Sequence, residues 1–214
     1  MSKVKMVCFD MDGTIADLYG VPNWLQGLRS FNPTPYEQAE PMWDMEELNK
    51  VLEMLQAQGI EIRIISWLSK ETNRRYDEQV RQAKRNWLKN QNFVCDNIHL
   101  VKYGTTKANC IRKYLAENEL AILIDDNEQV RNGWSLGDTI DPTKDNIIEI
   151  LKTLLWEFSF LAAQHFKMWK CWAFKKFFIF FKKTIDKYNI IVYNIDTTKK
   201  EGFNYDTKLY LWFI

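Results

Sequence analysis

Two aspartates one residue apart follow an apolar run near the N-terminus. The run Val4–Phe9 leads directly into Asp10 and Asp12, and Gly13 and Thr14 come next. If the run is a buried strand, both acids lie at its carboxyl end, where open α/β sheets bind ligands. Side chains two residues apart on an extended segment share a face, and burying two carboxylates so close together is costly without a cation between them. The pattern predicts a bound divalent metal with one carboxylate free to attack.

Three further groups stand where the same edge of a sheet would present them. Ser66 ends a second apolar run, Lys107 opens a pattern typical of a helix, and Asp125 and Asp126 end another apolar run. Together with the first two aspartates they supply a nucleophile, a hydroxyl, a cation and paired acids. This set is suited to phosphoryl chemistry.

Several of these assignments have alternatives in the sequence. Asp10 and Asp12 could form a turn or a helix cap. Ser66 could instead cap a helix that starts near Ser69, and Lys102 could take the place of Lys107. We favour Lys107 because it begins a helix, and the amino end of a helix attracts anions.

The elements that must position these groups alternate along the chain. The strand-like runs are Val4–Phe9, Glu61–Ser66, Asn97–Val101 and Leu120–Asp125. Residues at helical spacing predict helices over Met45–Gln58, Lys70–Asn90, Thr106–Asn118 and Asn146–Leu155. Strands that alternate with helices indicate parallel βαβ units, so we expect an α/β fold with a parallel sheet.

The segment Tyr19–Met42 does not follow this alternation, because it is rich in proline, asparagine and aromatic residues. It follows the first strand, so we expect it above the acids as a small lid or substrate loop over residues 19–42. An ordinary packed connector is the alternative. Its length allows one helix, at Asn23–Ser30, and not a full cap domain.

The residues above resemble the haloacid dehalogenase (HAD) superfamily of phosphotransferases. Residues Asp10 to Thr14 match its first motif, Ser66 the second, Lys107 the third, and Asp125-Asp126 the fourth. The segments Ala83–Leu88 and Tyr103–Ala108 look like those of a bacterial and phage subgroup with a minimal cap. The resemblance covers about residues 1–155, and the arrangement is distantly similar to the cytosolic deoxyribonucleotidases.

The resemblance implies a Rossmann-like sheet and Mg²⁺-dependent phosphoryl transfer. Asp10 would attack phosphorus and form an aspartyl-phosphate, and Asp12 would protonate the leaving oxygen and then activate water. Ser66 and Lys107 would bind the phosphoryl oxygens. In the implied assignment the metal is bound by the Asp10 carboxylate, the Asp12 carbonyl and Asp125, and Asp126 lies behind Asp125 or replaces it as a ligand. Thr14 and the backbone N–H groups near Gly13 would complete the phosphate-binding site.

The resemblance implies that the substrate is a small phosphorylated molecule, and nucleotides are the first candidates. Tyr19, Trp24 and Trp67 could stack on a base, although simple packing of the two tryptophans is an alternative. A nucleic-acid end phosphatase is also compatible. A HAD-fold binding or assembly protein that acts through its C-terminal extension is the hypothesis from a different class.

Composition divides the chain into two parts. The totals of 29 basic and 28 acidic residues favour no class of partner. From Lys152 onward, however, there are 11 lysines and 5 acids, and 18 of the 31 aromatic residues lie between Trp156 and Ile214. We therefore expect an acidic α/β body at 1–155 and a basic, aromatic extension at 156–214.

The extension invites several interpretations. Its lysines spread around a helical wheel over Trp156–Lys183, which argues against an interfacial membrane helix. Packing on the body or on a second subunit, contact with single-stranded nucleic acid, and an appendage without a selected role remain open. Short strands are predicted at Val192–Ile195 and Leu209–Phe213.

The cysteines and the apolar runs bear on the compartment. The four cysteines have no close-paired spacing, which favours free thiols in a reducing compartment: Cys8, Cys95, Cys110 and Cys171. No signal-peptide pattern precedes the first strand, and no apolar run approaches the roughly 18 residues that span a bilayer. These features lead us to expect a cytoplasmic protein.

Overall fold

A five-stranded parallel sheet forms the centre of the computed structural model, which describes residues 3–155, 195–197 and 207–209. Across the sheet the strands run β5 (Asn97–Val101), β4 (Glu61–Trp67), β1 (Lys3–Phe9), β6 (Glu119–Ile124) and β7 (Thr139–Ile140). Every neighbouring pair is parallel. The expected α/β arrangement is confirmed, and each predicted strand lies within one or two residues of the observed one.

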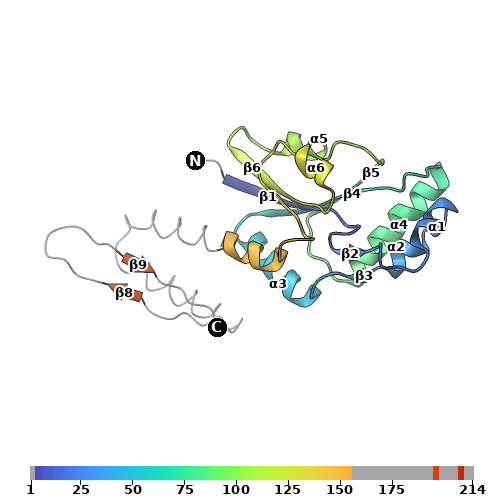
Figure 1. The fold of residues 1–214 in the computed structure, drawn as a ribbon. Helices are drawn as coiled ribbons and strands as arrows, with labels where there is room; N and C mark the ends of the chain where they lie inside the picture. Colours follow the sequence, from blue (N-terminus) through green and yellow to red (C-terminus); the bar gives the residue numbers. More distant parts are fainter. Residues whose placement is uncertain (1–2, 156–194, 198–206, 210–214) are drawn as a thin grey trace. The chain divides into compact units, whose positions relative to one another are not determined.

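Helices cover both faces of this sheet (Figure 1). They are α3 (Met45–Ala57), α4 (Arg74–Asn90), α5 (Lys107–Ile111), α6 (Glu128–Asn132) and a helical stretch over residues 147–155. The stretch 147–155 lies beside α3, where Lys152 Nζ is 2.8 Å from Glu47 Oε1. This contact agrees with the prediction that the segment returns to the body.

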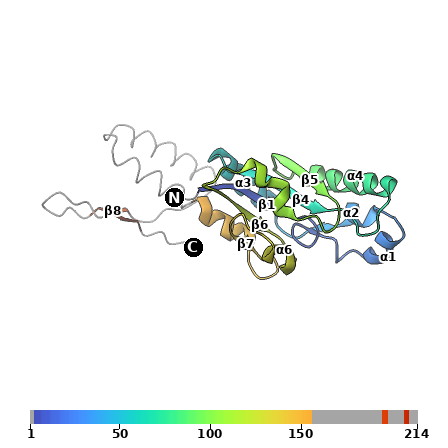
Figure 2. The ribbon, with the colours of Figure 1, turned by 90° about the horizontal axis from the view of Figure 1, so that it is seen from above.

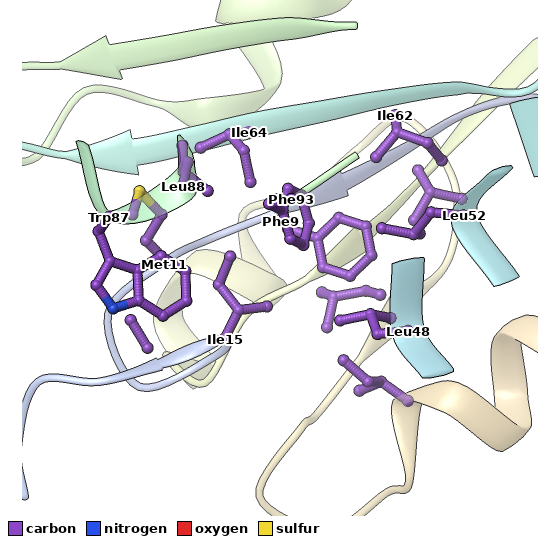
Figure 3. Close-up of a cluster of buried hydrophobic side chains, with 14 of the residues drawn as sticks. Phe9, Met11, Ile15, Leu48, Leu52, Ile62, Ile64, Trp87, Leu88 and Phe93 are labelled. Atoms are coloured by element: carbon purple, nitrogen blue, oxygen red, sulfur yellow. The ribbon is translucent and has the colours of Figure 1, made fainter. Parts of the chain in front are cut away.

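The alternation of side chains along the strands divides the core into two clusters. On one face Phe9, Ile62 and Ile64 pack with Leu48 and Leu52 of α3 (Figure 3). On the other face the neighbouring strand residues pack with α5, in a cluster that includes Met6, Cys8, Ile65, Ala108, Ile111 and Leu123. A strand that is covered on both faces has a continuous run of apolar residues, and Met6–Phe9 of β1 are apolar and fully buried.

Local capping explains where α3 and α4 begin. The side chain of Asp44 accepts hydrogen bonds from the backbone N–H groups of Glu46 and Glu47, both at 3.0 Å, and fixes the start of α3. Asn73 caps α4 in the same way, through the Tyr76 N–H at 2.9 Å. The prediction of a helix from Lys70 was therefore four residues too long at its amino end.

The predicted helix over Thr106–Asn118 was wrong in its second half. Helix α5 ends at Ile111, and a single 3₁₀ turn over Arg112–Tyr114 follows. The ring of Tyr114 lies under the guanidinium group of Arg63, 4.2 Å from its centroid. The 3₁₀ turn thus coincides with a contact to a strand residue, in a segment where intrinsic propensity favours a helix only weakly.

The segment Tyr19–Met42 contains more structure than the sequence suggested. A two-stranded antiparallel pair, β2 (Ala16–Asp17) and β3 (Glu40–Pro41), encloses the helices α1 (Trp24–Arg29) and α2 (Thr34–Gln38). Helix α2 lies beside α4 in the two views, and α1 lies next to α2 (Figures 1 and 2). The Trp87 Nε1 atom of α4 donates a hydrogen bond to the Ala39 carbonyl at 2.6 Å, so this segment is packed onto the body, and its role as a lid stays a prediction.

The chain divides into two compact units, Met1–Ser159 and Phe160–Ile214. In the second unit the structure describes only β8 (Ile195–Thr197) and β9 (Thr207–Leu209), which pair antiparallel. They meet the strands predicted there only at Ile195 and Leu209, and the other predictions for the extension fall outside the described residues. Among the described helices, none has the length and apolar character needed to cross a bilayer.

Candidate active site

The candidate site lies where the order of the strands reverses. Strand β1 has β4 on one side and β6 on the other, so the chain crosses over β1 between β5 and β6. In open α/β sheets, ligands bind at the carboxyl ends of the strands beside such a reversal. Asp10 follows β1, and its N–H donates to the carbonyl of Ile124, the last residue of β6, at 2.9 Å. The carboxyl ends of β1 and β6 are thereby held together.

Three carboxylates converge at this edge. One oxygen each from Asp10, Asp125 and Asp126 lie within 4.8 Å of one another, which is close enough to share a metal ion. Asp125 is fully buried, and its Oδ1 accepts a hydrogen bond from the Asn127 N–H at 2.9 Å. The buried Oδ1 atom of Asp10 has no hydrogen bond of regular geometry among the described residues, although the Nζ atom of Lys107 lies 2.9 Å from it. This group of carboxylate oxygens supplies the ligand atoms that Mg²⁺ prefers.

The loop after β1 can approach the acids only because it contains glycine. Gly13 has φ of 73°, a left-handed conformation. A Cβ atom there would lie 2.5 Å from Cε2 of Tyr19 and 2.6 Å from Oδ2 of Asp126. Thr14 is buried behind it, and its hydroxyl oxygen accepts from the Asp126 N–H at 3.2 Å. Thr14 thus joins the two acidic loops, while its predicted contact with substrate stays a prediction.

Lys107 is the lysine that reaches the carboxylates. Its Nζ atom lies 2.9 Å from Oδ1 of Asp10 and 2.7 Å from Oδ2 of Asp125. Burial alone would lower the pKa of Lys107, but these two carboxylates outweigh it and raise that pKa, so the lysine stays charged. Lys102, the alternative in the sequence, is exposed.

A second buried lysine, which the sequence analysis missed, occupies the other side of the loop. Lys84 of α4 places its Nζ atom 2.5 Å from Oδ2 of Asp12 and 2.8 Å from Oγ of Ser66. The Asp12 side chain therefore pairs with Lys84 and is not part of the carboxylate group of Asp10. Ser66 lies buried within β4, and Asn73 caps the helix that follows, so the alternative that Ser66 caps it is wrong.

A signal for Lys84 is present in the sequence. The buried residues of α4 are Tyr76, Val80, Ala83, Lys84, Trp87 and Leu88. Lys84 stands one turn from both Val80 and Leu88, so it interrupts the apolar stripe of an otherwise amphipathic helix. A lysine in that position is either paired in the interior or directed to a site.

Residues that are not among the three carboxylates hold the loop after β6 in place through hydrogen bonds. Arg131 of α6 donates one hydrogen bond to the Asp125 carbonyl at 2.6 Å and another to Oδ2 of Asp141 at 2.7 Å. Asn127 caps α6 by accepting from the N–H groups of Gln129 and Val130. These contacts hold the backbone of the Asp125-Asp126 loop in place.

Two pairs of aromatic rings lie next to the charged groups. Tyr19 packs edge-on against Trp24 with centroids 5.0 Å apart, and Trp67 packs against Tyr103 at 4.9 Å. Nε1 of Trp67 donates to the Thr105 carbonyl at 2.8 Å, and its ring lies 5.5 Å from Lys107 Nζ. Each tryptophan is packed, as the alternative proposed, whereas the tyrosine of each pair is exposed.

The electrostatics of the carboxylates predict a pH-dependent response to Mg²⁺. Burial, followed by the charges of Asp10 and Asp125, raises the pKa of Asp126 from 3.8 to about 7. Because the folded pKa is above the unfolded one, ionising this group weakens folding progressively from about pH 4 to pH 7, and the full cost remains above that range. A bound cation removes the cost. We therefore expect Mg²⁺ to raise the melting temperature more near pH 8 than near pH 5.5.

Thermal melts with and without Mg²⁺ at the two pH values check this expectation. The Asp126→Asn protein serves as the comparison, because it cannot ionise at this position and its Mg²⁺ response should depend less on pH. Equal shifts at both pH values in the unmodified protein would contradict the prediction.

Comparison with known proteins finds distant similarity in structure only. No family model matches the chain, and no curated protein matches it. A chain of the Pnkp1/Rnl/Hen1 RNA repair complex is 17% identical with a TM-score of 0.45, over 66% of this chain and 42% of that one. The D,D-heptose 1,7-bisphosphate phosphatase from Burkholderia thailandensis is 10% identical with a TM-score of 0.40, over 71% and 98%. At these values neither identifies an activity, so the geometry of the site must support any proposal.

Proposed function

We propose that this protein is a Mg²⁺-dependent phosphomonoester hydrolase of the HAD type. The observation that carries the proposal is the meeting of Asp10 and Asp12 with two buried lysines at the reversal point of a parallel sheet. A protein that only bound partners elsewhere would gain nothing from burying so many charges, because each costs free energy to desolvate. A site that handles a phosphate dianion requires them.

The charges of the site support a divalent cation. Four carboxylates, those of Asp10, Asp12, Asp125 and Asp126, face the two lysines Lys84 and Lys107. When all are ionised, two negative charges are left over, which one divalent cation balances. Asp10, Asp125 and Asp126 would hold it, together with the Asp12 carbonyl in the implied assignment. Bound Mg²⁺ would offset the charge of the phosphoryl oxygens.

The residues then have defined roles in two steps. In the first step Asp12 starts protonated, which its burial favours by raising its pKa. A carboxylate oxygen of Asp10 attacks phosphorus, the bond to the leaving oxygen breaks, and Asp12 gives that oxygen its proton. In the second step Asp12 takes a proton from water as the water attacks the aspartyl-phosphate, which releases inorganic phosphate and restores Asp10. Ser66 and Lys107 donate to the phosphoryl oxygens throughout.

Nucleotides are the first class of substrate that we propose. The exposed rings of Tyr19 and Tyr103 each lie against a packed tryptophan beside the site, and such surfaces stack on bases. The same rings would accept the terminal base of a single-stranded nucleic acid. A small sugar phosphate would make no use of them.

The test is Mg²⁺-dependent phosphate release by the full chain. The panel contains p-nitrophenyl phosphate, nucleoside monophosphates, glycerol phosphate and oligonucleotides with a 3′- or 5′-phosphate, each with Mg²⁺ and with EDTA. We expect turnover that requires the metal and favours substrates with a base. Folded, metal-loaded protein that releases no phosphate from any of them would overturn the proposal and put the binding-protein hypothesis first.

A further inference from the structure

Lys84 contacts two groups of the proposed reaction without belonging to the motifs that supply them. Its side chain comes from α4, whereas Asp12 and Ser66 come from the end of β1 and from β4. The residue has no exposed surface, and its Nζ atom lies 2.5 Å from Asp12 Oδ2 and 2.8 Å from Ser66 Oγ. The lysine therefore reaches from the helical layer into the phosphoryl side of the site.

Structural stability does not account for a lysine in this position. Burying an ammonium group is costly even when it is paired, and apolar residues of similar volume often stabilise a protein as well or better. The neighbours on the buried face of α4, Val80, Trp87 and Leu88, are apolar and would accommodate such a residue. A charge retained there is better explained by a ligand of opposite charge.

The hydrogen-bonding capacity of Ser66 points to that ligand. The hydroxyl oxygen of Ser66 accepts the hydrogen bond from Lys84, so its own proton remains available. Among the described residues, no acceptor receives that proton. The ammonium group of Lys84 has three N–H donors, and its two acceptors, Asp12 and Ser66, use two of them. The buried hydroxyl and the buried ammonium group can therefore each donate a further hydrogen bond to a ligand that binds next to both.

The ammonium group is also held in place from the side of the lid. The ring of Tyr36 in α2 lies 4.7 Å from Lys84 Nζ, within cation–π range. Trp87, one turn further along α4, donates to the Ala39 carbonyl at the end of the same lid segment. Because these two contacts join residues 36–39 to α4 at Lys84 and one turn beyond it, little ordering of the Lys84 side chain remains to be done when a ligand binds.

We propose that Lys84 is a second phosphate-binding cation of this site, which together with the Ser66 hydroxyl binds non-bridging oxygens of the phosphoryl group transferred to Asp10. Lys107 then acts on the side of the metal, and Lys84 acts on the side of Asp12. This inference rests on the proposed function, because it assigns a residue to the same phosphoryl group. It makes the lid helices part of the phosphate site through α4.

The test measures the binding of inorganic phosphate to the Mg²⁺-loaded full chain by calorimetry, without turnover. We expect Lys84→Met to weaken phosphate binding by about tenfold or more, as the loss of one charge-assisted hydrogen bond implies. Lys84→Arg keeps the charge and should retain most of the affinity. Lys89→Met is the matched control, because Lys89 is an exposed lysine of the same helix and its loss should change nothing.

A second variant covers the case in which Lys84→Met fails to fold. Lys84→Gln can still donate hydrogen bonds to Asp12 and Ser66 but carries no charge, and it should show the same loss of affinity. Unchanged phosphate affinity in a folded Lys84→Met or Lys84→Gln protein would overturn the inference. Failure of the proposed function gives a different result, namely phosphate binding that depends on Lys84 in a protein that hydrolyses nothing.

Discussion

Replacing Asp10 by asparagine should reduce turnover by about ten-thousandfold or more, as the loss of a nucleophile does in other enzymes that form covalent intermediates. Asparagine has the same shape, so substrate should still bind, but its amide cannot form the acyl phosphate. The expected result is a loss in kcat with little change in the affinity for inorganic phosphate. Steady-state kinetics on p-nitrophenyl phosphate, together with calorimetry, check both parts.

The melting temperature of the Asp10→Asn protein tests whether the carboxylates of the site repel one another in the absence of Mg²⁺. The carboxylate of Asp10 lies close to those of Asp125 and Asp126, and its Oδ1 atom is 2.9 Å from Lys107 Nζ. Removing its negative charge relieves repulsion among the carboxylates, while Lys107 keeps its ion pair with Asp125, so we expect the variant to melt at the same or a higher temperature in the absence of Mg²⁺. Asp145→Asn is the matched control, because Asp145 is exposed in the loop that precedes the stretch 147–155. An Asp10→Asn protein with full activity would exclude Asp10 as the nucleophile.

Replacing Lys107 by methionine should damage both activity and stability. The Nζ atom of Lys107 bridges Asp10 and Asp125, and its removal leaves buried carboxylates without their cation. Breaking a buried ion pair from one side costs about 3–5 kcal/mol. Losing a donor to the charged phosphoryl group costs about 10²–10³-fold in kcat. We expect both losses, with part of the stability returned by Mg²⁺.

Lys102→Met is the matched control for this experiment. Lys102 stands five residues earlier on the same connection and is exposed, so its removal should leave kcat and the melting temperature unchanged. Thermal melts in EDTA and in Mg²⁺, with steady-state kinetics on the same samples, distinguish the two lysines. Loss of activity in Lys102→Met with full activity in Lys107→Met would reverse the assignment.

The elements with strong periodic signals were predictable from the sequence. Strand β5 was predicted at its observed bounds, and the apolar runs placed β1, β4 and β6 to within a residue or two, because buried parallel strands are apolar on both faces. Helix α3 was predicted with its observed first residue and one residue too long at its end, because its apolar residues recur at helical spacing. The early end of helix α5 was not predicted, and it coincides with a contact between Tyr114 and Arg63, a strand residue distant in sequence.

The sequence by itself determined that Asp10, Ser66, Lys107 and Asp125 would stand at one edge of the sheet, because a residue that ends or follows a parallel strand must lie at that strand's carboxyl end. Only the tertiary structure decided how the charges pair. Asp10 and Asp12 are two residues apart, yet Asp10 forms an ion pair with Lys107 and Asp12 forms one with Lys84. The position of Lys84 depends on how α4 packs against β4 and residues 19–42, which are distant from it in sequence. The only sign of this packing in the sequence is that Lys84 interrupts the apolar face of the helix.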